Sequence, residues 1–455
     1  MLINKRDNVE VNPENGHKYA ICRINKNENV MKYGFAIGHA FENIEKGELV
    51  HTHNLKTNLS GKLSYEFNGA KEYKPISSSD TFWGYRRKNG RAGIRNDVWI
   101  ITTVGCVNKS AQRIAEKTGA KYFTHPFGCS QLGGDMEITQ KVLKGIVNHP
   151  NAGGVLVLGL GCENNNLDVF KRVLESWDDE RIRFLNAQDI EDEISAGVDI
   201  VKALQNRANA DKRTKIPFSE LKIGLKCGGS DGLSGITANP LVGRFCDRHT
   251  AIGGTCILTE VPEMFGAEQI LMDRCVDRNV FDKTVKMIND FKDYFIGHGQ
   301  EIYENPSPGN KEGGITTLEE KSLGCVQKGG TSIVTDVLEY GDTAEKNGLN
   351  LLTGPGNDMV AITNLAAAGA HLILFTTGRG TPLGTAVPTI KISTGSALAD
   401  KKKAWIDFDA GKCLSGESLT DELTSFVLAV AEGKLTKNEE NGYEEISIFK
   451  DGVVL

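Results

Sequence analysis

The chain has few of the features that would place it on nucleic acid or in a membrane. Its 455 residues carry a formal net charge of -6, and the basic run Lys401-Lys402-Lys403 is short. Nucleic-acid binding needs clustered lysine and arginine for phosphate contacts. The apolar stretches, such as residues 154–158, have strand length and are too short to span a bilayer. We therefore expect neither a nucleic-acid partner nor a membrane segment.

A secretory signal is also missing from the sequence. Residues 1–7 contain no apolar core of the kind that a signal peptide needs. We therefore expect a cytoplasmic location, where thiols stay reduced. The ten cysteines are then expected to be buried, catalytic or metal-bound rather than paired.

Several cofactor signatures are absent as well. No Cys-x-x-Cys pair occurs, which argues against a zinc ribbon or a ferredoxin-type cluster. The run Gly159-Leu160-Gly161 resembles half of a dinucleotide fingerprint, but residue 164 is Asn, and no Walker A motif occurs. A dinucleotide enzyme has little support in this sequence.

The order of apolar and polar segments divides the chain into four parts. Short apolar runs with Asn-Gly and Lys-Gly turns predict a small β domain over residues 1–57. Residues 58–81 lack periodicity and are expected to form a linker. From residue 82 onward, buried strands alternate with helical patterns, which is typical of a mostly parallel sheet. A polar break near residue 210 divides this α/β body into 82–210 and 211–455.

Four cysteines follow predicted strands at glycine-rich turns: Cys106, Cys129, Cys162 and Cys227. The carboxyl ends of parallel strands form the ligand crevice of an open sheet, so these thiols are expected to converge there. Thiolates are good ligands for iron and for iron–sulfur clusters. The alternative is four small buried residues at tight turns. Cys325, in an expected loop over residues 300–330, is a possible further ligand.

A histidine pair provides a second candidate group. His51 and His53 follow the apolar Leu49-Val50, and alternate residues of a strand point to the same face. The two imidazoles are therefore expected to act together in proton transfer or metal ligation. Of the remaining histidines, His17 is more simply structural.

Arginines at two turns are candidates for binding a carboxylate, because the guanidinium group binds carboxylates through two parallel hydrogen bonds. Arg86 lies in a turn before the first buried strand, where a solvated hairpin is the alternative. Arg379 follows the buried strand 372–375 and is the stronger candidate. Asp231 and Glu163 are further polar groups expected at the same crevice.

Long motifs make the chain similar to the altronate/galactarate dehydratase family of sugar-acid hydro-lyases, and closer to its altronate members. The N-terminal GHKYA and VHTHNLKT segments resemble the small β-clip (SAF-like) domain of that family. The stretches that carry the resemblance in the body are GYRRKNGRAGIRNDVWIITTVGCVN (84–108), HPNAGGVLVLGLGCENN (149–165), LKCGGSDGLSGITANP (225–240), ENPSPGNKEGGITTLEEKSLGC (304–325), LLTGPGNDMVAITNLAAAGAHLILFTTGRGTPLG (351–384) and KKKAWIDFDAG (401–411).

The resemblance implies a fold, a reaction and a cofactor. The fold class is α/β, with a Rossmann-like, mostly parallel sheet and a small N-terminal β-clip domain. The reaction is loss of water from D-altronate, giving 2-dehydro-3-deoxy-D-gluconate, with galactarate or another sugar acid as the alternative substrate. The cofactor is iron, as Fe(II) or an iron–sulfur cluster, with Mn(II) as another possibility. The family also implies a homodimer.

The chemistry of an aldonate assigns provisional roles to the candidate residues. A metal bound to the carboxylate stabilises the enediolate formed when the C2 proton leaves. We expect Cys106, Cys129, Cys162 and Cys227 to hold the metal, and His51 and His53 to move protons. Arg86 and Arg379 would hold the carboxylate, with Asp231 and Glu163 nearby. A non-catalytic protein that binds sugar acids is the alternative of a different class.

Overall fold

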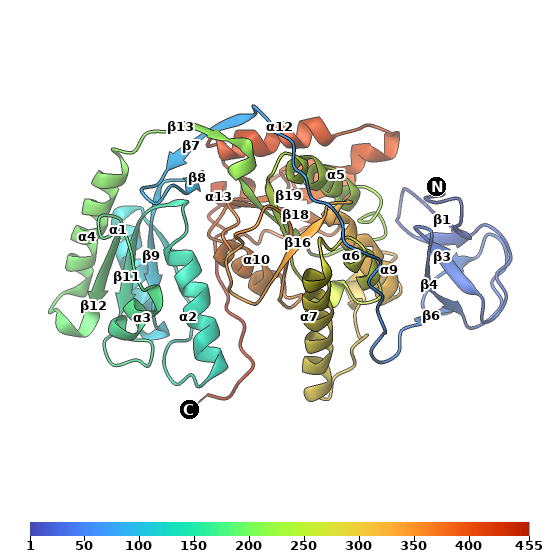
Figure 1. The fold of residues 1–455 in the computed structure, drawn as a ribbon, viewed down its shortest axis with the longest axis horizontal. Coiled ribbons are helices and arrows are strands. Elements are labelled where there is room, and N and C mark those ends of the chain that lie inside the picture. The colour runs from blue at the N-terminus through green and yellow to red at the C-terminus, as the bar shows by residue number, and fades with distance from the viewer. Residues whose placement is uncertain (455) are drawn as a thin grey trace.

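The computed structural model describes residues 1–454, which form three domains along the long axis of the molecule (Figure 1). The small N-terminal domain lies at one end, the middle α/β domain at the other, and the C-terminal α/β domain between them. The expected fold class is confirmed: a large parallel sheet is combined with small N-terminal antiparallel sheets. Within residues 1–454, no helix combines the length and the apolar character that crossing a bilayer requires.

The small domain consists of two three-stranded antiparallel sheets, with the orders β1-β2-β5 and β3-β4-β6. Its buried side chains, including Val30, Ile37 and Val50, belong to the same apolar core as the C-terminal domain. The small domain is therefore packed against the body of the protein. Its strands are β1 (Val9–Val11), β2 (Lys18–Ala20), β3 (Asn29–Lys32), β4 (Phe35–Ala40), β5 (Leu49–Val50) and β6 (Leu55–Lys56).

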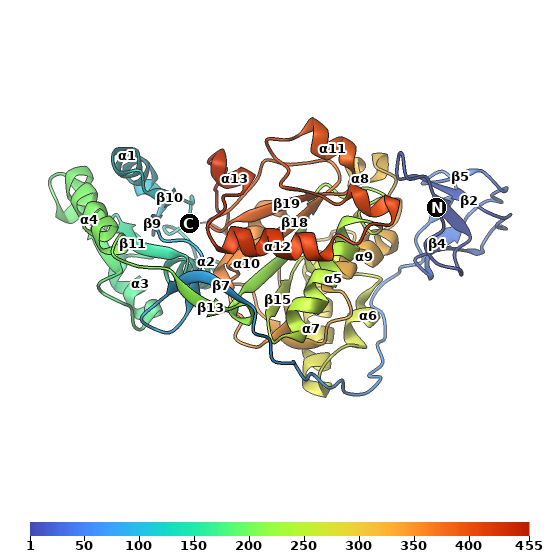
Figure 2. The same cartoon turned by 90° about the horizontal axis from the view of Figure 1, so that it is seen from above.

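A long segment without helices or strands joins the small domain to the middle domain. It runs from the end of β6 at Lys56 to the start of β7 at Thr81, and it passes along the C-terminal domain beside α6 and α7 (Figure 2). The Tyr65 hydroxyl donates to Glu268 at 3.1 Å, and the Tyr73 hydroxyl donates to the Thr250 carbonyl at 2.8 Å. The segment is therefore attached to the domain that it crosses.

The middle domain is built on a four-stranded parallel sheet with the order β10-β9-β11-β12. Strand β11 is buried along its whole length because α1 and α4 cover one face of the sheet and α2 and α3 the other. The elements are β9 (Asp97–Thr102), η1 (Gly105–Val107), α1 (Asn108–Thr118), β10 (Lys121–Phe123), α2 (Gly134–Val147), β11 (Ala152–Gly159), α3 (Leu167–Leu174), β12 (Ile182–Asn186), η2 (Ala187–Asp189) and α4 (Glu193–Ala208).

A small antiparallel sheet connects the middle and C-terminal domains. Strand β7 (Thr81–Arg86) pairs with β8 (Ala92–Gly93) on one side and with β13 (Thr214–Pro217) on the other. The chain thus enters and leaves the middle domain through neighbouring strands, which explains why the polar residues near 210 separate two compact units.

The C-terminal domain contains a seven-stranded parallel sheet with the order β16-β17-β15-β14-β18-β19-β20. Its strands are β14 (Lys222–Cys227), β15 (Thr255–Leu258), β16 (Val334–Leu338), β17 (Gly348–Leu352), β18 (Leu372–Thr377), β19 (Thr389–Ser393) and β20 (Phe408–Asp409). Its α-helices are α5 (Ala238–Ala251), α6 (Glu268–Met272), α7 (Arg278–Gly297), α8 (Pro308–Glu312), α9 (Leu318–Cys325), α10 (Asp358–Ala367), α11 (Ser396–Lys401), α12 (Thr420–Ala431) and α13 (Lys437–Glu440). Its 3-10 helices are η3 (Phe218–Glu220), η4 (Val261–Glu263), η5 (Val326–Gly329) and η6 (Gly411–Ser415).

Two of these helices correct the expected loop over residues 300–330. Helix α8 begins at a capping box, in which the Ser307 hydroxyl accepts from the Asn310 amide. Helix α9 begins after Thr317, whose hydroxyl accepts from the Glu320 amide. The caps satisfy the amides at both helix starts, so this glycine- and proline-rich stretch still forms ordered helices. Cys325 therefore ends a helix.

The two parallel sheets meet at the amino ends of their strands. Asn151, just before β11, donates to the carbonyl of His371, just before β18, at 2.8 Å. The ring of His149 contacts the carbonyl of Ala370 at 3.1 Å. The carboxyl edges of the two sheets are therefore not at this contact, and each sheet carries its own set of functional candidates.

Candidate active site

The carboxyl edge of the seven-stranded sheet brings together residues that follow three adjacent strands. Strand β14 lies between β15 and β18, and it ends at Cys227. Glu260 and Glu263 follow β15, and Arg379 follows β18. Glu260 has a φ of 73°, a left-handed conformation that costs a non-glycine residue about 1–3 kcal/mol. Such strain is typical of functional sites, and here it occurs among residues that follow adjacent strands of the large sheet.

A buried thiol pair lies at the centre of this edge. The sulfurs of Cys227 and Cys325 are 3.4 Å apart, and both contact one oxygen of Glu263, at 2.9 and 3.1 Å. Both cysteines are buried. The hydrogen bond from Cys325 lowers the pKa of Cys227 to about 7, and Lys328 also lowers it. A substantial fraction of the Cys227 thiol is therefore ionised near neutral pH.

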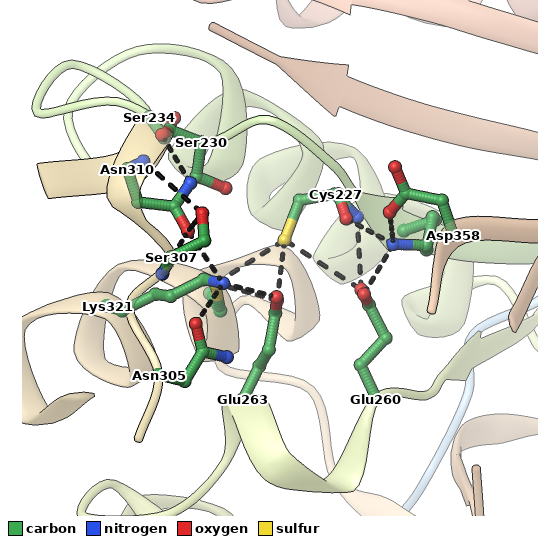
Figure 3. A network of polar contacts seen from close by, with 12 residues as sticks. Cys227, Ser230, Ser234, Glu260, Glu263, Asn305, Ser307, Asn310, Lys321 and Asp358 are labelled. Carbon is green, nitrogen blue, oxygen red and sulfur yellow. Dashed lines mark hydrogen bonds and ion pairs between the residues drawn. The ribbon is translucent and has the colours of Figure 1, made fainter. Parts of the chain in front are cut away.

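Three buried lysines contact the acidic groups of this cluster, and Figure 3 shows one of them, Lys321, beside Glu263. Lys328 donates to the Cys227 sulfur at 2.7 Å, and Lys321 pairs with Glu263 at 2.9 Å. Lys226 contacts Glu260 and also pairs with Asp358 at 2.7 Å. Burial opposes the charge of Lys226, but the attraction of the two carboxylates exceeds it and raises the pKa of Lys226 well above its usual value. Burial alone would raise the pKa of Glu263, but Lys321, Lys328 and Lys226 together lower it. Burial and the nearby Glu263 raise the pKa of Glu260 well above its usual value.

The donor set of this cluster suits a transition metal. Within residues 1–454, Cys227, Glu263 and Cys325 are the one group of three such ligand residues whose donor atoms all lie within 4.8 Å of one another. Two thiolates and a carboxylate are donors that bind iron. The neighbouring Cys227 and burial raise the pKa of Cys325 well above its usual value, so a divalent cation bound by both sulfurs would displace the proton of Cys325.

The expected convergence of four cysteines is wrong. Cys106, Cys129 and Cys162 are exposed in the middle domain, whereas Cys227 is buried at the end of a strand in the other sheet. The four turns are equivalent in pattern, but they belong to two sheets that meet at their amino edges. In the structure, the thiol of Cys227 contacts the thiol of Cys325 instead.

The three remaining thiols occupy neighbouring loops at the carboxyl edge of the middle sheet. The amide of Gly105 donates to the carbonyl of Phe127, and the amide of Asn165 donates to that of Gly128, both at 2.9 Å. These bonds join the loops of Cys106, Cys129 and Cys162 to one another. Their sulfurs do not form a set within 4.8 Å in the described part of the chain. Their role as iron ligands stays a prediction.

The expected His51–His53 pair is replaced by His51 and His17. Strand β5 ends at Val50, and the Asn54 amide donates to the His51 carbonyl, so residues 51–54 form a turn. His53 is therefore exposed and does not share a face with His51. Lys18 pairs with Val50 in the sheet, which puts the neighbouring ring of His17 at 5.7 Å from that of His51.

The small domain docks beside the carboxyl edge of the large sheet. The Nε2 atom of His51 donates to the Lys311 carbonyl at 2.9 Å. Gly16 is so close to Gly232 and Gly313 that a Cβ at Gly232 would lie 1.9 Å from the Gly16 carbonyl oxygen. Burial lowers the pKa of His51, so its ring is neutral near pH 7. A carbonyl only accepts, so Nε2 carries the proton and Nδ1 is the basic nitrogen.

Two of the four polar candidates lie at this edge. Asp231 is half-buried, accepts from Thr394 at 2.9 Å, and packs directly against Gly378. Burial raises the pKa of Asp231. Arg379 is about half exposed and pairs with Glu312 at 2.9 Å. Because both side chains lie near the docked small domain, they can contribute to one site.

The other two polar candidates lie elsewhere. Arg86 is in β7 and forms a bidentate ion pair with Glu220, which precedes β14 and so lies at its amino end. Glu163 accepts hydrogen bonds from the Leu160 and Gly161 amides and from the Thr103 hydroxyl. It therefore stabilises the loop that contains Cys162. Neither residue reaches the crevice beside Cys227, and the expectation that all four polar residues share it is wrong.

The sequence reasoning missed the lysines and the two glutamates of the cluster. The rule that selected Cys227 also applies to Glu260 and Glu263, because they follow the adjacent strand β15. The three lysines come from a strand, a helix and a 3-10 helix that are far apart in sequence. No local pattern marks them before the fold is known.

Comparisons with known proteins agree with this architecture. Residues 218–454 match "D-galactarate/Altronate dehydratase, C-terminal", residues 84–209 match "D-galactarate dehydratase/Altronate hydrolase, second domain", and residues 2–58 match "Altronate/galactarate dehydratase SAF domain".

Three relatives extend the similarity over almost the whole chain. The altronate dehydratase of Bacillus subtilis (strain 168) is 53% identical over 97% of this chain and 92% of its own length. The altronate dehydratase of Escherichia coli (strain K12) is 54% identical over the same shares. The galactarate dehydratase (L-threo-forming) of Escherichia coli (strain K12) is 32% identical over 96% of this chain and 90% of its own length. The resemblance seen in the motifs is confirmed: the chain belongs to the D-galactarate/altronate dehydratase family.

Proposed function

We propose that this chain is a hydro-lyase that converts D-altronate to 2-dehydro-3-deoxy-D-gluconate and water. The observation that carries the proposal is the 53% and 54% identity, over 97% of the chain, to two altronate dehydratases. The galactarate dehydratase is far less similar, at 32%. The carboxyl edge of the large sheet supports the proposal, because imidazole, cationic and acidic side chains meet there.

The reaction needs a base, an acid and a cationic group for the carboxylate. When the base takes the C2 proton, the electrons of the C2–H bond form a C2–C3 double bond. The C3–O bond breaks, and the departing hydroxyl takes a proton and leaves as water. The remaining enol tautomerises to the 2-keto acid. The whole sequence is a loss of water with no change in the overall oxidation state.

The docked small domain and the sheet edge supply these groups. His51 has a lowered pKa and a basic Nδ1, so it accepts a proton at neutral pH. Arg379 would exchange its exposed partner Glu312 for the substrate carboxylate, since a guanidinium forms two parallel hydrogen bonds with a carboxylate. Asp231 holds the turn beside Arg379 through Thr394 and Ser234.

We further propose iron as the cofactor, as Fe(II) or as a cluster, with Mn(II) as the alternative. Cys227, Cys325 and Glu263 would hold it, because their donor atoms and charges fit a divalent cation. When bound, the metal supplies Lewis-acid polarisation of oxygen ligands. Cys106, Cys129 and Cys162 are the second candidate set, on the adjoining loops of the middle domain.

We also propose that the protein works as a homodimer in the cytoplasm. The dimer follows from the family resemblance. All ten cysteines are unpaired, which suits a reducing compartment.

Purified protein, loaded anaerobically with Fe(II) and kept reduced, is expected to release a 2-keto-3-deoxy acid from D-altronate. A colorimetric assay for keto acids measures the product, with galactarate as the competing substrate. Turnover of galactarate without turnover of altronate would assign the chain to the other branch of the family. No turnover of either acid, with iron bound, would contradict the hydro-lyase proposal.

His51→Ala is expected to lower kcat by about 100-fold, which is the usual contribution of a general base. His53→Ala is the matched control, because this neighbouring imidazole is exposed. Iron content should not change in either variant. The lowered pKa of His51 places the acid limb of kcat/KM below about pH 6.5, with activity lost as the ring becomes protonated. Equal kcat values for the two variants would remove His51 from the mechanism.

A further inference from the structure

A cavity of about 780 Å³ lies between the middle and C-terminal domains, remote from the carboxyl edge that carries Cys227. It is lined from the middle domain by Arg87 and Arg181 and from the C-terminal domain by Gly341 and Gly369. His149, which contacts Ala370 where the amino edges of the two sheets meet, also lines it. The cavity therefore belongs to the junction between the domains and takes no part in the proposed reaction.

Arg181 is the unusual residue of this cavity. It is only 4% exposed, and its Nε has no hydrogen-bond partner. Within residues 1–454, its guanidinium forms neither a hydrogen bond nor an ion pair, whereas the guanidinium of the neighbouring Arg87 contacts Pro150, Asn96 and Asp211. A buried cation without a partner is rare, because burial removes its hydration without compensation.

The surroundings of Arg181 are rich in positive charge. The Asp211 carboxylate forms ion pairs with both Arg87, at 3.0 Å, and Arg207, at 3.2 Å. One negative charge therefore compensates two guanidinium groups. Burial and the charge of Arg181 together lower the pKa of Arg87 to about 10. Lys144 pairs with Glu175 at 2.9 Å, and both line the cavity. Six lysines and arginines line the cavity against four carboxylates, so its lining keeps an excess of positive charge.

We propose that this interdomain cavity binds a small molecule with a phosphoryl or carboxylate group, held by the guanidinium of Arg181. A planar guanidinium forms two parallel hydrogen bonds with either group. The volume of the cavity is that of a typical site for a small metabolite. Because both domains line the cavity, the bound molecule would contact both and would fix their relative position. The site is separate from the proposed catalytic edge and does not depend on the proposed function.

Isothermal titration calorimetry of the full chain tests this site without relying on activity. The probes are inorganic phosphate and D-gluconate, each titrated at constant ionic strength. At least one of them is expected to bind saturably to the unmodified protein, and Arg181→Gln is expected to weaken that binding by at least about tenfold. Phosphate alone would identify a phosphoryl ligand, and gluconate alone a carboxylate. Arg172→Gln, which removes an exposed arginine of α3 outside the cavity, should bind as the unmodified protein does.

Arg181→Gln is expected to fold, because it removes a buried charge that has no partner. Its melting temperature without anions should equal or exceed that of the unmodified protein, whereas a purely structural arginine would lower it. If this variant does not fold, Arg181→Lys is the second test. It keeps the positive charge but loses the planar guanidinium, and it should still weaken binding. The proposal is overturned if neither anion binds the unmodified protein saturably, or if the Arg181 variants bind as tightly as Arg172→Gln.

Discussion

Cys227→Ser is expected to remove most of the iron and most of the turnover together. Its sulfur has three close neighbours, namely Cys325, Glu263 and Lys328. A serine hydroxyl is a poorer iron ligand and does not ionise near neutral pH, whereas the pKa of Cys227 is about 7. A loss of about 100-fold in iron affinity and activity is expected from a disrupted metal site. Anaerobic metal analysis and the keto-acid assay measure the two quantities on the same preparation.

Two further serine variants make this result specific. Cys413→Ser changes a half-buried thiol of the same domain that contacts Arg244, and it should leave iron and turnover unchanged. Cys106→Ser tests the second candidate set in the middle domain. If Cys106→Ser removes the iron and Cys227→Ser keeps it, the metal is held by the middle-domain loops and the Cys227 cluster has another role. Circular dichroism of each variant shows whether it is folded.

The fold class could be predicted from the sequence because its signals are local. Buried strands such as β11 and β18 appear as apolar runs, and the helices between them identify parallel connections. The rule that ligands bind at the carboxyl edge correctly placed Cys227, Asp231 and Arg379 at one such edge, and their roles there stay predictions. The same rule could not say that Cys106, Cys129 and Cys162 belong to another sheet. Strand order and the contact between the amino edges depend on tertiary packing, which no local pattern encodes.

The errors at the histidines and at α9 have physical causes in short elements. Strand β5 is only two residues long, so the alternation assumed for His51 and His53 did not extend far enough. The pairing of β2 with β5, a contact between distant segments, brings His17 to His51. The glycines and Pro308 around α8 and α9 suggested a loop, although Ser307 and Thr317 were available as helix caps.

Glu320→Gln is expected to loosen the small domain, because Glu320 compensates two buried lysines of that domain. Lys18 and Lys32 each contact a carboxylate oxygen of Glu320 at 2.8 Å, and all three side chains are almost fully buried. Burial alone would raise the pKa of Glu320, but the two ammonium groups exceed this effect and lower it. Removing one partner of a buried ion pair costs about 3–5 kcal/mol, because the remaining charges lose their compensation.

The loss should be concentrated at residues 1–57, since the lysines lie in β2 and β3 and Glu320 lies in α9 of the C-terminal domain. Hydrogen exchange of these two strands is therefore expected to accelerate more than exchange of β14 or β18. Glu14→Gln, an exposed carboxylate of the same domain, is the control. Replacing Lys18 and Lys32 by Met together with Glu320→Gln should restore part of the protection, since no uncompensated charge then remains buried. Unchanged exchange in Glu320→Gln would mean that apolar contacts alone hold the small domain. Activity should fall with the loss of protection, because His51 reaches the catalytic edge only while the small domain is docked.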